Sequence, residues 1–155
     1  MSDAPQSPLD VPETAEVSIA KDAKEREERQ GNEDAIAQQV VDAAIVIHKE
    51  LGPGLLESIY VGALVIELTE RGLPVTREAP IRAVYRGQPL GVAYRADLIV
   101  GSLVLVEVKS VDGLCPAHHA QTLTYLRLSG LRVGLLMNFS APLMKQGIKR
   151  LVNKF

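Results

Sequence analysis

The stretch Tyr94-Arg-Ala-Asp-Leu-Ile-Val-Gly-Ser-Leu-Val-Leu-Val-Glu-Val-Lys-Ser110 decides the fold that we expect for this chain. Two apolar runs, Leu98–Val100 and Leu103–Val106, flank a Gly-Ser pair, and short apolar runs bounded by turn residues are typical of buried strands. Three charged residues lie in or beside these strands: Asp97, Glu107 and Lys109. An unpaired charge in a core strand is costly, and it finds a partner or becomes neutral. Two acids and a lysine placed together therefore suggest a metal site.

The loop between the two strands decides whether the three charges share a face. Glu107 and Lys109 are two residues apart, so they lie on one face of their strand. A two-residue loop at Gly101-Ser102 places Asp97 on the opposite face, whereas a three-residue loop, or a bulge beside Gly101, places it on theirs. Because Gly101 favours an irregular turn, we predict an irregular hairpin with Asp97, Glu107 and Lys109 on one face.

This arrangement has two interpretations. Carboxylates on adjacent strands can hold a hard divalent cation through oxygen ligands, and a nearby lysine can orient a water or stabilise charge on a phosphate. The alternative is a structural ion triad that only orders the sheet, because such networks are also common. The three residues alone leave both interpretations open.

Further motifs accompany the hairpin in a fixed order along the chain: Gly54-Leu-Leu-Glu57-Ser-Ile-Tyr60, Asp97, Glu107-Val-Lys109 and Gln121-Thr-Leu-Thr-Tyr125. The Asp and the Glu-x-Lys resemble the core of the PD-(D/E)XK nuclease superfamily. The first motif resembles the one that names the GxxExxY proteins, a bacterial and archaeal branch, and the last resembles the Gln-x-x-x-Tyr element of RecB-like nucleases. The resemblance covers about residues 36–152, with one departure, since Ala96 and not proline precedes Asp97.

The resemblance implies roles for the hairpin residues. Asp97 and Glu107 would bind Mg²⁺ or Mn²⁺, and Lys109 would position or activate water. Glu57 would complete the metal site, directly or through water. The alternative for Glu57 is an acid that only favours the positive end of a helix.

The resemblance also implies roles for three residues outside the hairpin. Gln121 and Tyr125 would lie by the scissile bond and help to position DNA or the lysine; otherwise they are two amphipathic residues at a helix edge. His48 would be an extra metal ligand, as in some RecB-like nucleases, or else a partly buried histidine satisfied by a hydrogen bond.

Periodicity and breaker residues predict the elements around the hairpin. They are a helix from Asn32 or Glu33, a helix over 55–71 capped by Gly72, a strand over 74–85 with Pro80 at an edge or bulge, a helix over 117–129, a covered strand over 133–139 and a short edge strand over 148–153. We therefore predict an α/β fold with a restriction-endonuclease-like αβββαβ core. Its mixed sheet of four to five strands is flanked by helices, with an extra N-terminal helix.

Composition divides the chain. Residues 1–32 have the polar, acidic composition of a disordered tail, although Lys21–Gln30 is charged enough for a solvated helical extension. Residues 33–155 are expected to form one PD-(D/E)XK nuclease-like domain. Residues 1–73 have 6 Lys and Arg against 15 Asp and Glu, whereas residues 74–155 have 11 against 4. The half that bears the expected site is basic, which suits a phosphodiester substrate.

Several classes of protein are excluded. No apolar run approaches the roughly 18 residues that a membrane span needs, and the acidic N-terminus has no signal-peptide core, so we expect a cytoplasmic protein. The single Cys115 excludes a disulfide framework or an iron–sulfur cluster built from this chain. Gly52-Pro-Gly lacks the Gly-Lys-Ser/Thr ending of a P-loop.

The expected function is that of a metal-dependent nuclease that hydrolyses phosphodiester bonds in DNA. The alternatives are a non-catalytic module that binds nucleic acid or protein and retains the nuclease fold, and a structural oligomer whose ion triad orders the sheet. A homo-oligomer or a protein partner stays open.

Overall fold

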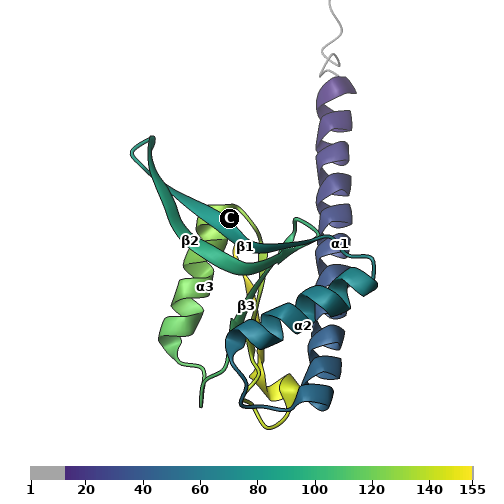
Figure 1. Ribbon diagram of the computed structural model, residues 1–155. Helices are drawn as coiled ribbons and strands as arrows, with labels where there is room; N and C mark the ends of the chain where they lie inside the picture. Colours follow the sequence, from purple (N-terminus) through teal and green to yellow (C-terminus); the bar gives the residue numbers. More distant parts are fainter. Residues whose placement is uncertain (1–12, 155) are drawn as a thin grey trace, which may run out of the picture. The chain divides into compact units, whose positions relative to one another are not determined.

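The central element of the computed structural model, which describes residues 13–154, is a five-stranded sheet with the order β1-β2-β3-β4-β5 (Figure 1). Its strands are β1 (Val75–Tyr85), β2 (Gln88–Val100), β3 (Val104–Lys109), β4 (Val133–Asn138) and β5 (Ile148–Val152). β3 and β4 are parallel, and the other neighbouring pairs are antiparallel. The sheet is therefore mixed, as predicted, and the proline-bearing strand β1 lies at an edge.

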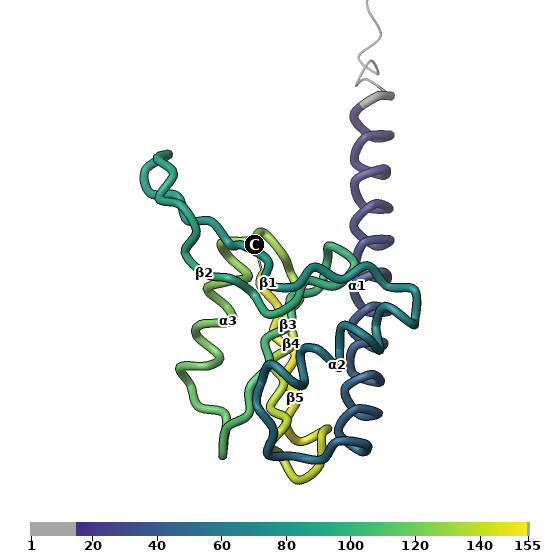
Figure 2. Tube along the Cα trace, in the orientation of Figure 1, coloured from purple at the N-terminus to yellow at the C-terminus, as the bar shows by residue number. Residues whose placement is uncertain are grey.

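Three helices flank the sheet in the predicted order: α1 (Glu13–Leu51), α2 (Glu57–Glu70) and α3 (Pro116–Ser129). A short 3₁₀-helix, η1 (Met144–Gly147), was not predicted and precedes β5. The part of α1 from residue 33 onwards and α2 pack on one face of the sheet, while α3 packs on the other. The Cα trace shows the same arrangement for residues 33–154 (Figure 2). The fold is an α/β fold of the restriction-endonuclease-like kind, with the extra N-terminal helix.

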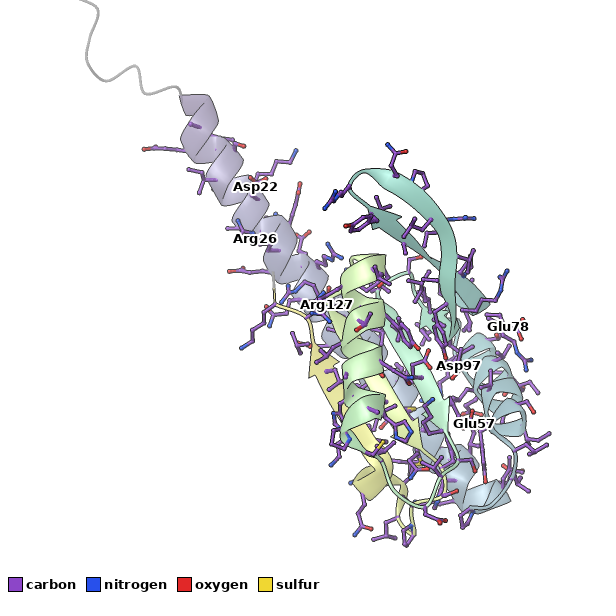
Figure 3. All side chains as sticks on the ribbon, turned by 90° about the vertical axis from the view of Figure 1, so that its left-hand side faces the viewer. Asp22, Arg26, Glu57, Glu78, Asp97 and Arg127 are labelled. Carbon is purple, nitrogen blue, oxygen red and sulfur yellow. The ribbon has the colours of Figure 1, made fainter. Side chains whose placement is uncertain are left out.

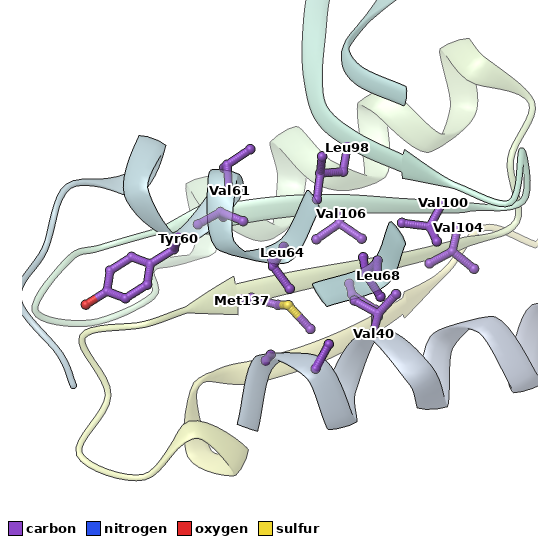
Figure 4. Close-up of a cluster of buried hydrophobic side chains, with 14 of the residues drawn as sticks. Val40, Tyr60, Val61, Leu64, Leu68, Leu98, Val100, Val104, Val106 and Met137 are labelled. Atoms are coloured by element: carbon purple, nitrogen blue, oxygen red, sulfur yellow. The ribbon is translucent and has the colours of Figure 1, made fainter. Parts of the chain in front are cut away.

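The two faces of the sheet bury two separate clusters of side chains. The larger one lies under α1 and α2 and includes Val104, Val106 and Val108 of β3 (Figure 4). The smaller one lies under α3 and includes Leu105. Because side chains alternate along a strand, Glu107 and Lys109 lie on the same face as Leu105, which is the face covered by α3.

The hairpin between β2 and β3 has a three-residue loop, which is one of the two alternatives that the sequence left open. Leu98 pairs with Val106 and Val100 with Val104, which leaves residues 101–103 to turn the chain. Gly101 has a φ of +59°, and a Cβ atom added there would lie 2.5 Å from Cδ1 of Ile36. Glycine suits this turn because it adopts a positive φ without strain, and a larger residue would also have to displace the end of the Ile36 side chain.

The start of the chain differs from the expectation. α1 begins at Glu13 and not at Asn32 or Glu33, so residues 13–32 are helical in the structure, as the alternative of a solvated extension allows. Their side chains are exposed from residue 15 on, and Lys21 and Glu25 form an ion pair at 3.9 Å. The rest of the predicted tail, residues 1–12, lies outside the described residues.

The chain divides between Asn32 and Glu33 into two units. Among residues 13–154, no helix combines the length and the apolar character that crossing a membrane requires.

Candidate functional site

The strands β2 and β3 separate at the two predicted acids. Their paired register ends at Leu98 and Val106, so the next step along the same register puts Asp97 opposite Glu107. Oδ2 of Asp97 accepts a hydrogen bond from the main-chain nitrogen of Val108 at 2.8 Å. Oε1 of Glu107 accepts one from the main-chain nitrogen of Asp97 at 3.3 Å. Each carboxylate is thus held by the backbone of the strand opposite, and the two side chains replace the missing rungs of the ladder.

The environment of these carboxylates penalises negative charge. Glu107 is only 1% exposed, and its burial, followed by the charge of Asp97, raises its pKa to about 7. Burial also raises the pKa of Asp97, while the hydrogen bond from Val108 and the charge of Lys109 act in the opposite direction. A buried acid and a half-buried acid that both resist ionisation form a site that a cation would stabilise.

Lys109 ends β3 on the same face as Glu107 and is half-buried. Its carbonyl oxygen accepts a hydrogen bond from the main-chain nitrogen of Phe139 at 2.9 Å. The loop that follows is fixed by the buried Asn138, which accepts from the nitrogen of Val111 at 3.1 Å and donates to its carbonyl at 2.9 Å. The end of β3 is therefore held in place on both sides of the lysine.

Two stacked tyrosines reach Glu107 from the α3 side. The hydroxyl of Tyr94 donates to Oε2 of Glu107 at 3.1 Å. The ring of Tyr94 lies parallel to that of Tyr125 on α3, with 3.8 Å between ring centroids and 5° between ring planes. Burial, followed by the charge of Glu107, raises the pKa of Tyr94, so the phenol stays a neutral donor. Tyr125 thus contacts the site through Tyr94.

The predicted motif Gly54-x-x-Glu57-x-x-Tyr60 shapes the loop before α2. Tyr60 is fully buried and stacks on Phe139 at 4.3 Å between centroids. Its hydroxyl donates to the carbonyl of Gly52 and accepts from the nitrogen of Leu55 at 3.1 Å. Tyr60 therefore closes the glycine-rich loop and determines where α2 begins.

That loop places Glu57 at the first residue of α2, beside the end of β3. Oε1 of Glu57 accepts a hydrogen bond from the nitrogen of Ser110 at 3.3 Å, and Oγ of Ser110 donates to the carbonyl of Leu55 at 2.7 Å. Glu57 is exposed and lines a surface pocket with Leu55, Leu56, Ser58 and Ser110. The motif thus brings a third acid next to the residue that follows Lys109.

A fourth acid, Glu78, joins the surroundings of Asp97. It lies in β1 between Arg77, which pairs with Leu98, and Ala79, which pairs with Ala96. Its φ of +52° is unusual for a residue with a side chain. Negative charge on Glu57 and on Glu78 raises the pKa of Asp97, and Figure 3 shows the three acids in one part of the molecule.

The carboxylates do not form a complete cage. Among residues 13–154, no three His, Cys, Asp or Glu side chains are placed so that they could hold a metal ion together. Mg²⁺ keeps several waters and is commonly bound through one or two carboxylates. The pair Asp97 and Glu107 therefore fits such an ion, because it offers carboxylate oxygens as ligands and because a positive charge would stabilise both ionised acids.

The remaining predicted residues have different surroundings. Gln121 is exposed on α3, one turn before Tyr125. His48 is buried, and its Nε2 lies 2.8 Å from the carbonyl oxygen of Ala141. This hydrogen bond accounts for the burial of His48, which lies beside Leu143 and Met144 in a separate surface pocket.

Sequence reasoning missed three residues of this region: Tyr94, Glu78 and Asn138. The signal for Tyr94 is that a tyrosine in a buried setting needs a partner for its hydroxyl. Asn138 ends an otherwise apolar run, and a lone polar residue there also needs partners. Nothing in the sequence around Glu78 indicates its backbone conformation.

Comparison with known proteins identifies the family of the chain. Searches of curated proteins and of solved structures found no significant match. The model of the PD-(D/E)XK nuclease superfamily matches residues 34–151, which include β1 to β4, most of β5 and the acids described above. The chain belongs to the PD-(D/E)XK nuclease superfamily.

Proposed function

We propose that this protein is a metal-dependent nuclease that hydrolyses phosphodiester bonds in DNA, in the cytoplasm, through a site in residues 33–155. The observation that carries the proposal is the pair Asp97 and Glu107, two acids held opposite each other by cross-strand hydrogen bonds. Lys109 lies on the same face of β3 as Glu107. Superfamily membership supports hydrolysis of nucleic acid, and the basic composition of residues 74–155 suits a phosphodiester substrate.

Asp97 and Glu107 would hold Mg²⁺ or Mn²⁺, with Glu57 as a further ligand through water, because no third acid is placed for direct coordination among residues 13–154. When bound, such an ion polarises a phosphoryl oxygen and lowers the pKa of a bound water. Lys109 would orient the attacking water or stabilise the charge that develops on the phosphate. Tyr94 would keep the carboxylate of Glu107 oriented, and Tyr125 would keep Tyr94 in place by stacking.

We also infer that the chain belongs to the GxxExxY, RecB-like branch of the superfamily. The contacts of Tyr60 support this, because they give the motif a physical role in placing Glu57 at the end of β3. Gln121 would then contact the DNA, since it is exposed on the helix that carries Tyr125. His48 would remain a structural residue, because its hydrogen bond to Ala141 satisfies it.

The test is cleavage of linear duplex, circular and single-stranded DNA with Mg²⁺ or Mn²⁺. Wild type is compared with Lys109→Ala and Glu107→Gln, and Lys145→Ala serves as the control because Lys145 is an exposed lysine of η1. We expect metal-dependent cutting that falls about 10²–10³-fold or more in both site variants and is unchanged in the control. DNA binding without cutting by wild type on all three substrates would contradict the proposal and favour the non-catalytic binding module.

A further inference from the structure

The hairpin of β1 and β2 extends beyond the body of the sheet. Ile81 and Tyr94, which pair with each other, are its last residues that pack into the cluster under α3. From Arg82 to Ala93 every residue is exposed except the half-buried Ala83. Figures 1 and 2 show this part as a twisted ribbon that projects from the sheet. We call residues 82–95 the arm.

The arm has a defined shape although, apart from Tyr94 at its base, none of its residues packs into the cluster under α3. Register shifts lie between Ile81 and Arg82 and between Ala83 and Val84, and such bulges strengthen the twist of a strand pair. The turn at its tip consists of two residues with positive φ, Arg86 at 49° and Gly87 at 74°. These values are those of a tight type I′ hairpin turn, so the arm ends in a sharp tip.

The tip displays an arginine where smaller residues are favoured. Asn, Asp or Gly usually takes the first position of a type I′ turn, because a longer side chain is strained there. The guanidinium of Arg86 lies over the ring of Tyr85, with 5.1 Å from Cζ to the ring centroid. Tyr85 is 59% exposed. An aromatic ring and a cation are thus presented together to solvent.

The charge of the arm has one sign. It contains Arg82, Arg86 and Arg95 and no lysine or acid, and all three arginines are exposed. Exposed apolar side chains lie between them: Val84, Tyr85, Leu90 and Val92. A second copy of the chain is a poor partner, because a symmetric pairing of two arms would bring three arginines against three arginines. A polyanion that also offers apolar surface in its grooves fits this composition.

The arm leads directly to the candidate site. Arg86 precedes Asp97 by 11 residues of the same hairpin, so its backbone reaches at most about 36 Å from Asp97 at roughly 3.3 Å per residue. One turn of B-form DNA spans about 34 Å. The three arginines can therefore meet phosphates up to one helical turn away from a bond bound at Asp97 and Glu107.

We propose that the arm binds duplex DNA and holds the phosphates of the helical turn next to the bond that is cut; the location of that bond rests on the proposed function. The arm contributes affinity that depends on charge, and it positions the duplex without reading its sequence. Arg82, Arg86 and Arg95 contact phosphates, while Tyr85 at the tip lies against the groove edge.

The test measures binding of a fluorescent duplex of about 30 base pairs, nearly three helical turns, to the full chain by anisotropy. The buffer contains EDTA and no divalent ion, so nothing is cut and binding is measured separately from cleavage. The arm variant carries Arg82→Gln, Arg86→Gln and Arg95→Gln. The matched control carries Lys145→Gln, Lys149→Gln and Lys154→Gln, three exposed charges outside the arm.

We expect the arm variant to bind at least about tenfold more weakly at moderate salt and the slope of log K against log salt to fall by about 2 to 3, since each phosphate contact contributes about 0.9. The control should keep most of the wild-type slope. Shortening the duplex to about one helical turn should weaken binding of wild type more than that of the arm variant.

Equal losses in the arm variant and the control would overturn the proposal, because only net charge would then matter. Unchanged affinity and slope in the arm variant would also overturn it. So would a change in self-association, measured by sedimentation, without a change in DNA binding. The two proposals can fail separately. If the arm variant binds duplex DNA more weakly while wild type binds DNA without ever cutting it, the role of the arm is supported and only the proposed nuclease activity is contradicted.

Discussion

Strand β2 contributes to two regions that treat charge in opposite ways. At its inner end, Asp97 lies beside the buried Glu107, where each acid raises the energy of ionising the pair and main-chain donors hold both side chains. From Gln88 to Arg95 the strand belongs to the arm, whose arginines carry their charges into solvent. Buried charge is expensive and is fixed in position, which suits bond-breaking chemistry. Exposed charge costs little and is mobile, which suits attraction of a polyanion.

The largest difference that we predict between the two regions of β2 concerns the cleavage rate. Asp97→Asn should lower the cleavage rate at saturating DNA by about 10³-fold or more, because it removes a charge that nothing else replaces. Arg95→Gln, two residues away, should leave that rate within about twofold and raise only the DNA concentration needed for saturation. Steady-state cleavage with a metal series measures both. Similar losses of rate in the two variants would contradict the division of β2 into a chemical and a binding region.

The next largest effect concerns the stability of the fold: removing the charge of Glu107 should raise stability although it lowers activity. The pKa of Glu107 is raised to about 7 in the fold from an ordinary 4.5, with Asp97, Lys109 and Tyr94 as the groups that face it. Between these values the folded chain keeps a proton that the unfolded chain has released. The contribution of Glu107 to the free energy of unfolding is therefore fully present below pH 4.5 and is lost as the pH rises through 7. By pH 8 the loss amounts to about 3 kcal/mol.

Glu107→Gln removes this penalty, so the variant should be more stable than wild type at pH 8 by up to about 3 kcal/mol, with a difference that shrinks toward pH 5. Urea denaturation at several pH values measures it. Asp112→Asn, at an exposed acid in the loop after β3, is the control and should change stability by less than about 0.5 kcal/mol. Mg²⁺ or Mn²⁺ should raise the unfolding temperature of wild type and not of Glu107→Gln. If Glu107→Gln were less stable than wild type at pH 8, the ionised carboxylate of Glu107 would not destabilise the fold as we predict.

The sequence predicts which residues of the β2–β3 hairpin share a face, because Gly101 favours an irregular turn and side chains alternate strictly along strands. The same local rules predict the edge position of β1 from Pro80 and the end of a helix at Gly72, which has a positive φ. These features depend on a few neighbouring residues each, so they can be read before the fold is known.

Other features depend on contacts between distant segments, and the sequence does not contain them in readable form. Tyr94 reaches Glu107 across the pair of strands β2 and β3, and α3, which comes later in the chain, brings Tyr125 onto its ring. The helix over residues 13–32 also differs from the disordered composition, since ion pairs one turn apart, such as Lys24 with Glu28, favour a solvated helix. Composition alone does not separate a charged helix from a charged coil.

A smaller effect is expected where a buried tyrosine is compared with an exposed one. Tyr60→Phe removes a hydroxyl that bonds to both Gly52 and Leu55, so two backbone groups lose a partner and stability should fall by about 1–2 kcal/mol. Tyr85→Phe in the arm should change stability by less than about 0.5 kcal/mol. Thermal or urea unfolding measures both. Equal effects would show that the contacts of Tyr60 do not hold the loop before α2.

The smallest predicted effect tests Tyr94 as a positioning residue. Its hydroxyl donates to Glu107, and that bond favours the ionised carboxylate. In Tyr94→Phe the carboxylate loses this donor, so its pKa rises further and the acidic limb of the cleavage profile should move upward by about one pH unit. The rate above that limb should fall by about tenfold or less, because the ring still stacks on Tyr125. Tyr85→Phe is the matched control and should shift nothing. A loss of rate with an unmoved limb would mean that Tyr94 acts on the substrate or the fold and not through Glu107.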